Sequence, residues 1–161
     1  MNRPLAYIVR DQKPIVLAAD EAVGGACGLM RERGTGSVLV VDKLKRLSGI
    51  FTGRDAVRLL ARARDASTTL LAQAMTRNPT TVNPSDSALD ALRTMAEGGF
   101  RHLPVIDDGK IYGVVSLTTL EVAGQSPLTL SPRCVRCPRT SIWLLSLRHR
   151  MASASLSPTS E

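Results

Sequence analysis

The chain contains the same unit twice, and this duplication restricts its possible folds more than any other feature. The segment from Pro14 to Lys45 aligns without a gap on Pro79 to Lys110. The second copy then lacks one residue in a turn, after which Gly49 to Thr52 matches Gly113 to Ser116. A unit this short cannot bury its own apolar face, so we expect the two copies to pack on each other. A cleft between two similar halves suits a small ligand, which predicts a binding module rather than an active site.

The composition is typical of a soluble globular protein with an aliphatic core. The chain has 161 residues, of which 43% are apolar but only 3% aromatic. No apolar run approaches the roughly 20 residues that a membrane-spanning helix needs. The N-terminus reads Met-Asn-Arg-Pro and lacks the apolar core of a secretion signal. We therefore expect a cytoplasmic protein without a membrane partner.

The positive charge does not indicate a nucleic-acid surface. The net charge is +7, but five arginines and one glutamate follow Ala123, which leaves the repeated region only weakly basic. Nucleic-acid surfaces usually combine a dense basic stripe with interleaved aromatic side chains. We therefore do not expect nucleic acid to be the main partner.

The sequence lacks the usual patterns of catalytic and metal sites. It contains no HExxH or GxSxG motif, and Gly34 to Ser37 lacks the Gly-Lys-Ser/Thr that completes a P-loop. Cys134 and Cys137 have the spacing of half a zinc site, but no second pair of ligands accompanies them. Together with Cys27 they do not form a disulfide framework in a cytosolic chain. We predict neither an enzyme nor a metal centre.

Each copy shows the pattern strand, helix, strand, strand, helix. In the second copy we expect a short strand at 80–82 and a helix that Ser85 caps and Gly98-Gly99 ends. Strands at 103–106 and 111–116 follow, joined by a tight turn at 107–110. A last helix starts at Leu117 and is cut short by Gly124 and Pro127. The expected apolar face of the first of these helices consists of Ala88, Leu89, Leu92, Met95 and Ala96.

The first copy follows the same order. We expect strands at 15–17, 37–41 and 47–51, and a first helix from about Asp20 to Arg33. The second helix, Gly53 to Arg64, has an apolar side that predicts its buried face, formed by Ala56, Val57, Leu60 and Ala61. A connector at 65–76 joins the two copies.

The first helix carries glycines at positions 24, 25 and 28, each of which costs roughly 1 kcal/mol relative to Ala. Gly24 and Gly28 share one face, where a neighbouring backbone can approach closely. This face either packs within the monomer or contacts a second copy in a dimer.

After residue 123 the periodic pattern ends. Ser, Pro, Thr and Arg dominate residues 124–161, and the one apolar run, 142–145, is too short to form a domain. We expect an irregular, disordered tail. Docking of the apolar run onto the module or a membrane surface stays open as an alternative.

The sharpest local motif is Gly49-Ile50-Phe51-Thr52-Gly53-Arg54-Asp55, in which a strand leads into a helix. The N–H groups at a helix N-terminus suit phosphate, and the two oxygens of Asp55 suit the two hydroxyls of a ribose. The same Thr-x-x-Asp pattern is also a capping box. Copy two keeps the hydroxyl at Ser116 but has Thr119 in place of the acid, so ribose binding predicts two clefts of different affinity.

Arg101 and His102 lie just before a strand and form a candidate phosphate-facing pair. A lone histidine is more often structural, and both interpretations stay open. Arg54, Arg58 and Arg62 lie four residues apart on one helix face, which is typical of a solvated surface. Arg54 is the member nearest the proposed ligand.

These motifs closely resemble the CBS-domain family (cystathionine-β-synthase-type repeats), and the pair resembles a Bateman module. The clearest stretches are Ala74 to Val82, His102-Leu103-Pro104-Val105 and Gly113 to Ser116. The resemblance covers about residues 7 to 123. It implies an α/β (α+β) fold with two βαββα repeats, at 7–65 and 74–123, related by a pseudo-twofold axis.

The resemblance also implies a function. Family members bind adenosine-containing ligands such as AMP, ADP, ATP or S-adenosylmethionine between the repeats, often as homodimers. A stand-alone pair then reports the state of its ligand to a partner protein. A ligand-free dimerisation or scaffold module is the alternative, and a nucleic-acid-binding regulator is a weaker one. The family pattern places ribose at Thr52 and Asp55, adenine at the first strands and phosphate before the third strand, so the candidate ligand-binding residues are Ile15, Val16, Thr52, Arg54, Asp55, Thr80, Thr81, Arg101, His102, Pro104, Ser116 and Thr119.

Overall fold

The structure of the chain is a computed structural model, and it describes residues 3–122. The tail expected at 124–161 and the helix breakers Gly124 and Pro127 lie outside these residues. The elements in chain order are α1 (Leu5–Val9), β1 (Val16–Ala18), α2 (Val23–Glu32), β2 (Ser37–Val41), β3 (Leu47–Thr52), α3 (Gly53–Ala61), α4 (Leu71–Ala74), β4 (Thr76–Arg77), α5 (Ala88–Gly98), β5 (His102–Asp107), β6 (Lys110–Ser116) and α6 (Leu117–Val122).

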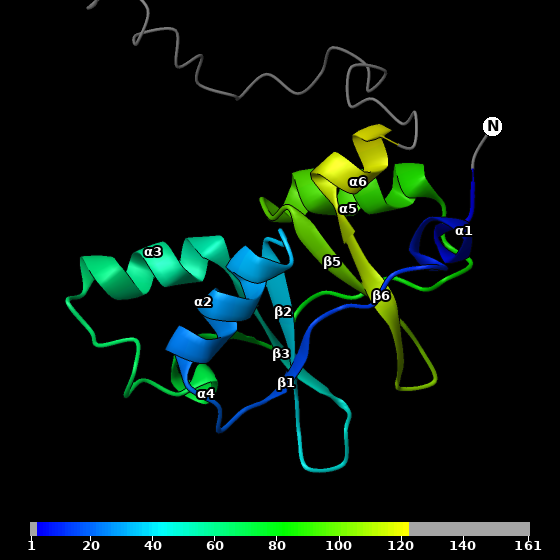
Figure 1. The fold of residues 1–161 in the computed structure, drawn as a ribbon. Helices are drawn as coiled ribbons and strands as arrows, with labels where there is room; N and C mark the ends of the chain where they lie inside the picture. The colour runs from blue at the N-terminus through cyan, green and yellow to red at the C-terminus, as the bar shows by residue number, and fades with distance from the viewer. Residues whose placement is uncertain (1–2, 123–161) are drawn as a thin grey trace, which may run out of the picture. The chain divides into compact units, whose positions relative to one another are not determined.

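The first repeat is built on a four-stranded sheet in the order β1-β2-β3-β4. β1 pairs with β2 in parallel, whereas β3 pairs antiparallel with both β2 and β4. Helices α2 and α3 lie together beside this sheet (Figure 1). The aliphatic side chains between the layers form one core, with Val38, Val40 and Phe51 from the sheet and Val23 and Ala26 from α2.

The second repeat is built on the β5–β6 hairpin, which α5 and α6 cover (Figure 1). The tight turn expected at 107–110 is confirmed, since Asp108 and Gly109 have φ values of 46° and 75°, as a type I′ hairpin turn requires. The strand expected at 80–82 is reduced to a single parallel bridge between Val82 and Val105.

The two repeats complete each other. Helix α1, which precedes the first repeat, packs on the second, where the Leu5 N–H donates to the Asp86 carbonyl at 2.9 Å. Helix α4, which precedes the second repeat, packs on the first, where the Leu71 N–H donates to the Glu21 carbonyl at 2.8 Å. This exchange confirms that two tandem repeats pack on each other.

Helix boundaries differ from the sequence-based expectation. Helix α2 begins at Val23 rather than near Asp20, and α3 ends at Ala61 rather than Arg64. The expected cap of α5 at Ser85 is wrong. Ser87 is the cap, because its hydroxyl accepts from the Asp90 N–H at 3.1 Å. The end of α5 is confirmed, since Gly99 follows it in the left-handed region with φ 66°.

The expected apolar faces of two helices need correction. In α3 the buried side chains are Asp55 and Leu59, whereas Val57 and Leu60 are 64% and 69% exposed. The capping contacts of Asp55 hold its side chain on the inner side of the helix. Val57 and Leu60 lie on the opposite side of the helix, so they face outward. In α5 the buried side chains are those of Ala88, Ala91, Leu92 and Met95, while Leu89 is half-buried and Ala96 is exposed.

Two of the α2 glycines lie in different surroundings. A Cβ at Gly24 would lie 3.3 Å from the Ala66 carbonyl oxygen, and the Gly24 N–H donates to that oxygen at 2.8 Å. Close packing within the monomer therefore accounts for Gly24. A Cβ at Gly28 would meet nothing within 4 Å, so a dimer contact at Gly28 stays a prediction.

We predict that Gly49→Ala destabilises the protein by about 1–3 kcal/mol, because overpacking forces backbone shifts. A Cβ at Gly49 would collide with the Met75 side chain and lie 2.9 Å from the Thr76 carbonyl oxygen, where β4 pairs with β3. Urea unfolding measures the change. The matched control, Gly28→Ala, has open space and should stabilise α2 by up to about 1 kcal/mol. Equal effects of the two variants would contradict the close approach of Met75 and Thr76 to Gly49.

Candidate functional site

Two clefts lie between the repeats, and each is lined by both copies. The first, here called the Asp55 cleft, has a volume of about 720 Å³ and is lined by Thr52, Asp55 and Arg58 from the first repeat and by Thr80, Arg101 and His102 from the second, among others. The second, here called the Thr119 cleft, has a volume of about 620 Å³ and is lined by Lys13, Ile15, Thr35, Ser116, Thr118 and Thr119, among others. Both volumes are in the range of small-molecule sites.

The carboxylate of Asp55 is held at the junction of β3 and α3. Its Oδ2 accepts from the Thr52 N–H at 3.0 Å and from the Thr52 hydroxyl at 2.7 Å. Its Oδ1 accepts from Arg58 Nη1 at 3.1 Å. Asp55 is 6% exposed, whereas the Arg58 side chain is 61% exposed. Thr52 and Asp55 thus form the expected capping box, and the same carboxylate also lines the cleft.

Arg54 connects the two repeats at the Asp55 cleft. Its Nη1 donates to the Gly99 carbonyl at 3.1 Å, from the first turn of α3 to the end of α5. This contact holds a guanidinium at the cleft.

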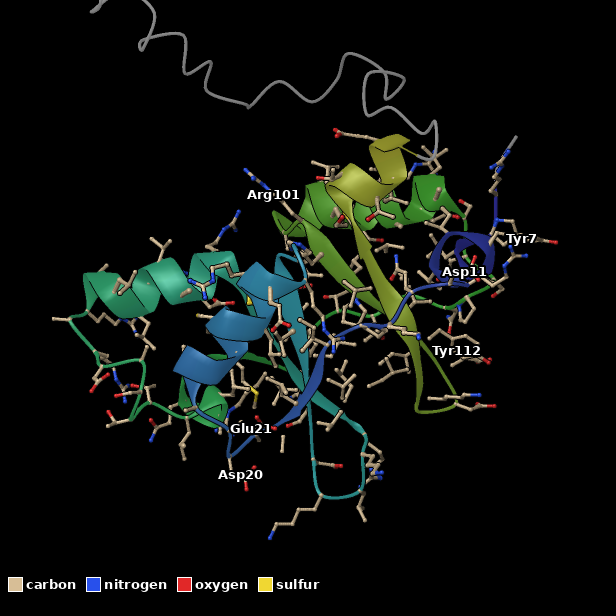
Figure 2. All side chains as sticks on the ribbon, viewed as in Figure 1. Tyr7, Asp11, Asp20, Glu21, Arg101 and Tyr112 are labelled. Atoms are coloured by element: carbon tan, nitrogen blue, oxygen red, sulfur yellow. The ribbon has the colours of Figure 1, made fainter. Side chains whose placement is uncertain are left out.

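Arg101 and His102 line both clefts. Figure 2 shows Arg101 between the helices of the two repeats. In the aligned copies, Gly36 and Ser37 stand where the second repeat has Arg101 and His102. A Cβ at Gly36 would lie 3.0 Å from His102 Nε2, so the glycine makes room for the imidazole. Burial, and then the charges of Arg101 and Arg54, lower the pKa of His102 below its usual 6.5.

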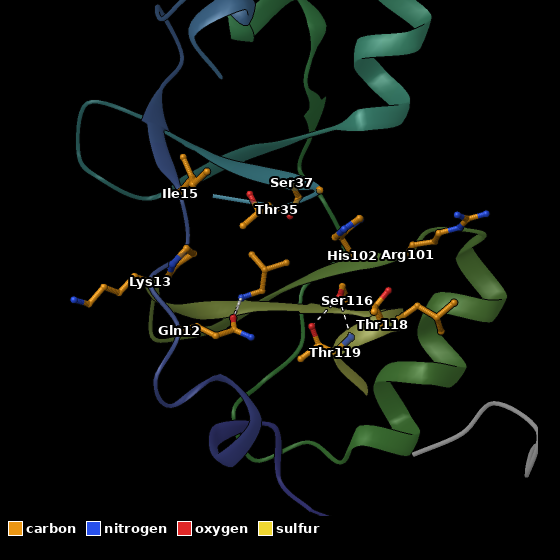
Figure 3. A pocket seen from close by; sticks show the side chains of 15 residues that line it. Gln12, Lys13, Ile15, Thr35, Ser37, Arg101, His102, Ser116, Thr118 and Thr119 are labelled. Carbon is orange, nitrogen blue, oxygen red and sulfur yellow. Dashed lines mark hydrogen bonds between the residues drawn. The ribbon is translucent and has the colours of Figure 1, made fainter. Parts of the chain in front are cut away.

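The Thr119 cleft has two hydroxyls where the Asp55 cleft has a hydroxyl and an acid. The Ser116 and Thr119 hydroxyl oxygens lie 2.8 Å apart in a hydrogen bond, and the Thr119 N–H donates to the Ser116 hydroxyl at 3.1 Å. This pair caps α6 as Thr52 and Asp55 cap α3. Figure 3 shows it on the wall of the cleft.

The remaining predicted site residues divide between the clefts and the surrounding structure. Thr80 lines the Asp55 cleft, and Ile15 lines the Thr119 cleft. Val16, Thr81 and Pro104 line neither of these clefts. Val16 pairs with Leu39 in the sheet, and the buried Pro104 accepts from the Val82 N–H at 3.0 Å.

The clefts also contain lining residues that were not predicted from the sequence, notably Lys13, Gly36, Arg58, Asn78 and Phe100. The repeat alignment could have indicated some of them, because it pairs Lys13 with Asn78 and Gly36 with Arg101. Arg58 was assigned to the solvated face, and its ion pair with Asp55 places it at the cleft.

No group of three or more His, Cys, Asp or Glu side chains within residues 3–122 could hold a metal ion. None of the helices in this part of the chain combines the length and apolar character needed to cross a bilayer.

Comparisons with known proteins agree with the duplication. The CBS domain family model matches residues 5–62 and 71–123. A CBS domain-containing protein of Arabidopsis thaliana (CBSCBSPB2) is 36% identical over 111 residues, which are 68% of this chain and 21% of that protein. The chain therefore spans about a fifth of this relative's length.

Solved structures share the same fold. A protein with CBS domains from Burkholderia ambifaria has a TM-score of 0.69 and 32% identity, with 80% of this chain and 100% of that chain covered. The CBS domain pair of protein MJ0100, solved in complex with 5′-methylthioadenosine and S-adenosyl-L-methionine, has a TM-score of 0.70 and 20% identity, with 77% of this chain and 97% of that chain covered.

We predict that His102 protonates below pH 6.5 and that Arg101→Met raises its pKa. An NMR pH titration of the imidazole signals measures both, and His102→Gln identifies the signal. Because the folded-state pKa is depressed, the unfolded chain binds the proton first. The free energy of unfolding should therefore fall as pH drops from about 6.5 to the folded pKa, and this contribution is constant below it. The pKa values of Asp42, Asp65 and Asp90 are also lowered. Their protonation changes the free energy of unfolding only near and below their usual pKa of 3.8, outside the range of His102. A His102 pKa above 6.5 would contradict the burial of this side chain.

Proposed function

Since the chain belongs to the CBS domain family, as a pair of repeats, we propose that it is a regulatory module that binds an adenosine-containing ligand in the Asp55 cleft. The observation that carries this proposal is the buried Asp55 carboxylate, which lines a cleft shared by both repeats beside several cationic side chains. The MJ0100 pair, which has the same fold and is in complex with two adenosine compounds, supports the ligand class.

Asp55 is suited to the hydroxyls of a ribose. A carboxylate accepts hydrogen bonds at both oxygens, and one of the three donors that Asp55 receives comes from the exposed Arg58 side chain. A diol can therefore replace Arg58 while Thr52 keeps the carboxylate in place. The exposed Arg58 is then free to turn toward the rest of the ligand.

The charge of the cleft favours a ligand with phosphate. Arg54, Arg58 and Arg101 line it, and Asp55 is the one carboxylate among its described lining residues. Arginine binds phosphate through a two-pronged guanidinium contact, whereas the sulfonium of S-adenosylmethionine brings another positive charge. We therefore place AMP, ADP and ATP ahead of S-adenosylmethionine.

Signalling follows from the shared lining. Ribose would contact α3 of the first repeat, and phosphate would contact Arg101 of the second. A ligand that touches both repeats stabilises the arrangement in which they are correctly spaced, in proportion to its differential affinity. We propose that a partner protein reads this arrangement and that the module itself catalyses no reaction.

We predict that Asp55→Asn weakens AMP and ATP binding by about tenfold or more, because a charge-assisted hydrogen bond contributes about 1.5–3 kcal/mol. Isothermal titration calorimetry on the full chain measures the affinity. The amide keeps an acceptor for Thr52, which limits damage to the cap of α3.

The control is Asp90→Asn in α5. Asp90 serves a similar capping pair with Ser87 but lines none of the clefts described above. Because the Asp90 side chain is 57% exposed and that of Asp55 is 6% exposed, this variant should lose less stability than Asp55→Asn and keep its nucleotide affinity. Unchanged affinity in Asp55→Asn would remove Asp55 from the site, and no binding by the wild type would remove the proposal.

A second candidate function is dimerisation without a ligand. Val57 and Leu60 lie one turn apart on α3 and are 64% and 69% exposed, which is the kind of apolar surface that a second copy of the chain can cover. Val57 also lines the Asp55 cleft, so a second copy packed on α3 would lie next to a ligand bound there.

We predict that Leu60→Ser shifts the protein toward monomers in light scattering over a concentration series. Leu44→Ser is the matched control, because Leu44 is equally exposed at 69% but lies in the turn between β2 and β3. Loss of the apolar side chain from a dimer interface should lower dimer affinity roughly tenfold or more. Identical oligomeric states for both variants and the wild type would argue against an α3 interface.

A further inference from the structure

We propose that the Thr119 cleft is a site for a compact phosphate-bearing anion rather than for a second nucleoside. The two clefts have related positions in the duplicated fold, but their side chains differ in kind. The difference lies in the group that follows the last strand of each repeat and in the charges that surround it.

The Thr119 cleft lacks a carboxylate. None of the described residues that line the Thr119 cleft is Asp or Glu. Where the Asp55 cleft holds a carboxylate with two acceptor oxygens, this cleft holds the Thr119 hydroxyl, which is already hydrogen-bonded to Ser116 at 2.8 Å. A ribose diol would find no pair of strong acceptors there.

The lining of the Thr119 cleft is positively charged. Lys13 lies toward one end of the cleft and Arg101 toward the other, with His102 near its middle (Figure 3). Both side chains are exposed and point away from the centre of the cleft in Figure 3, so each would turn inward to reach a bound anion. With no acid among the described lining residues to oppose them, these groups favour a negative ligand.

The Thr119 cleft is also rich in hydroxyl groups. Thr35, Ser37, Ser116, Thr118 and Thr119 all line the cleft. A hydroxyl donates one hydrogen bond, and several hydroxyls around an arginine fork can satisfy the many acceptor oxygens of a phosphate group. A neutral or cationic ligand would use fewer of these donors.

The test titrates the full chain with inorganic pyrophosphate at fixed ionic strength, in the wild type and in two variants. Lys13→Ala should weaken binding about two- to fivefold, as for loss of one partly exposed charge contact. Thr119→Asp should weaken binding by roughly tenfold or more through like-charge repulsion. The new pattern Ser116-x-x-Asp has the form of the Ser87–Asp90 cap that α5 already uses, so the variant should fold, which circular dichroism checks.

Two controls define the site. Lys43→Ala removes the same charge from the β2–β3 turn, outside both clefts, and should leave pyrophosphate binding within about twofold of the wild type. Arg54→Met removes a cation that lines the Asp55 cleft but not the Thr119 cleft, so it should also leave pyrophosphate binding within about twofold. Pyrophosphate binding can therefore persist even if nucleotide binding to the Asp55 cleft fails, so the two proposals are tested separately.

Four results would overturn the proposal. Equal weakening by Lys13→Ala and Lys43→Ala would mean that pyrophosphate responds only to overall charge. An unchanged affinity in Thr119→Asp would place the anion elsewhere, and the absence of binding by the wild type would mean that the Thr119 cleft is not a pyrophosphate site. Displacement of pyrophosphate by adenosine in the Asp55→Asn variant would show that the Thr119 cleft takes nucleosides.

Discussion

The arrangement of the two repeats depends on the exchange of the segments that precede them. Helix α4 packs on the first repeat and α1 on the second, so each repeat is partly covered by a helix from the start of the other. A glycine in each repeat lies against the segment that comes from the start of the other repeat. Gly49 lies under Met75 and Thr76, and the matching Gly113 lies under Val9 and Gln12. Because both glycines lie this close to the exchanged segments, sliding of one repeat on the other would break the β3–β4 backbone pairing as well as apolar contacts.

This exchange also fixes the clefts. The residues that follow α4 form one wall of the Asp55 cleft, and the residues that follow α1 form one wall of the Thr119 cleft. The duplicated backbone makes the clefts similar in size, and single substitutions make them different in chemistry. Asp55 against Thr119 changes the acceptors, while Gly36 against Arg101 means that Arg101 and His102 of the second repeat serve both clefts.

The duplication allowed much of this fold to be predicted from sequence, because an alignment of two copies reports equivalent positions directly. The strands at 37–41 and the hairpin turn at 107–110 were predicted with their observed bounds. The face of α3 was not, because periodicity counts apolar side chains and cannot tell that a charged one is buried. The carboxylate of Asp55 turns inward to satisfy Thr52, and Val57 and Leu60 consequently point outward. The sharing of Arg101 and His102 between clefts was also missed, since it arises only when the pseudo-twofold axis brings position 36 next to position 102.

Capping and ligand binding are compatible roles for Asp55, and the geometry explains why. A buried carboxylate without partners would be costly, and the capping contacts from Thr52 remove that cost whether or not a ligand is present. No buried side-chain nitrogen or oxygen within residues 3–122 lacks a hydrogen-bond partner. The acid is thus held in one orientation before any ligand arrives, and a ligand need displace only the exposed Arg58. Preorganisation of this kind lowers the entropic cost of binding. In the second repeat the two hydroxyls perform the capping role without the charge, so the same helix start is kept while the acceptor for a diol is lost.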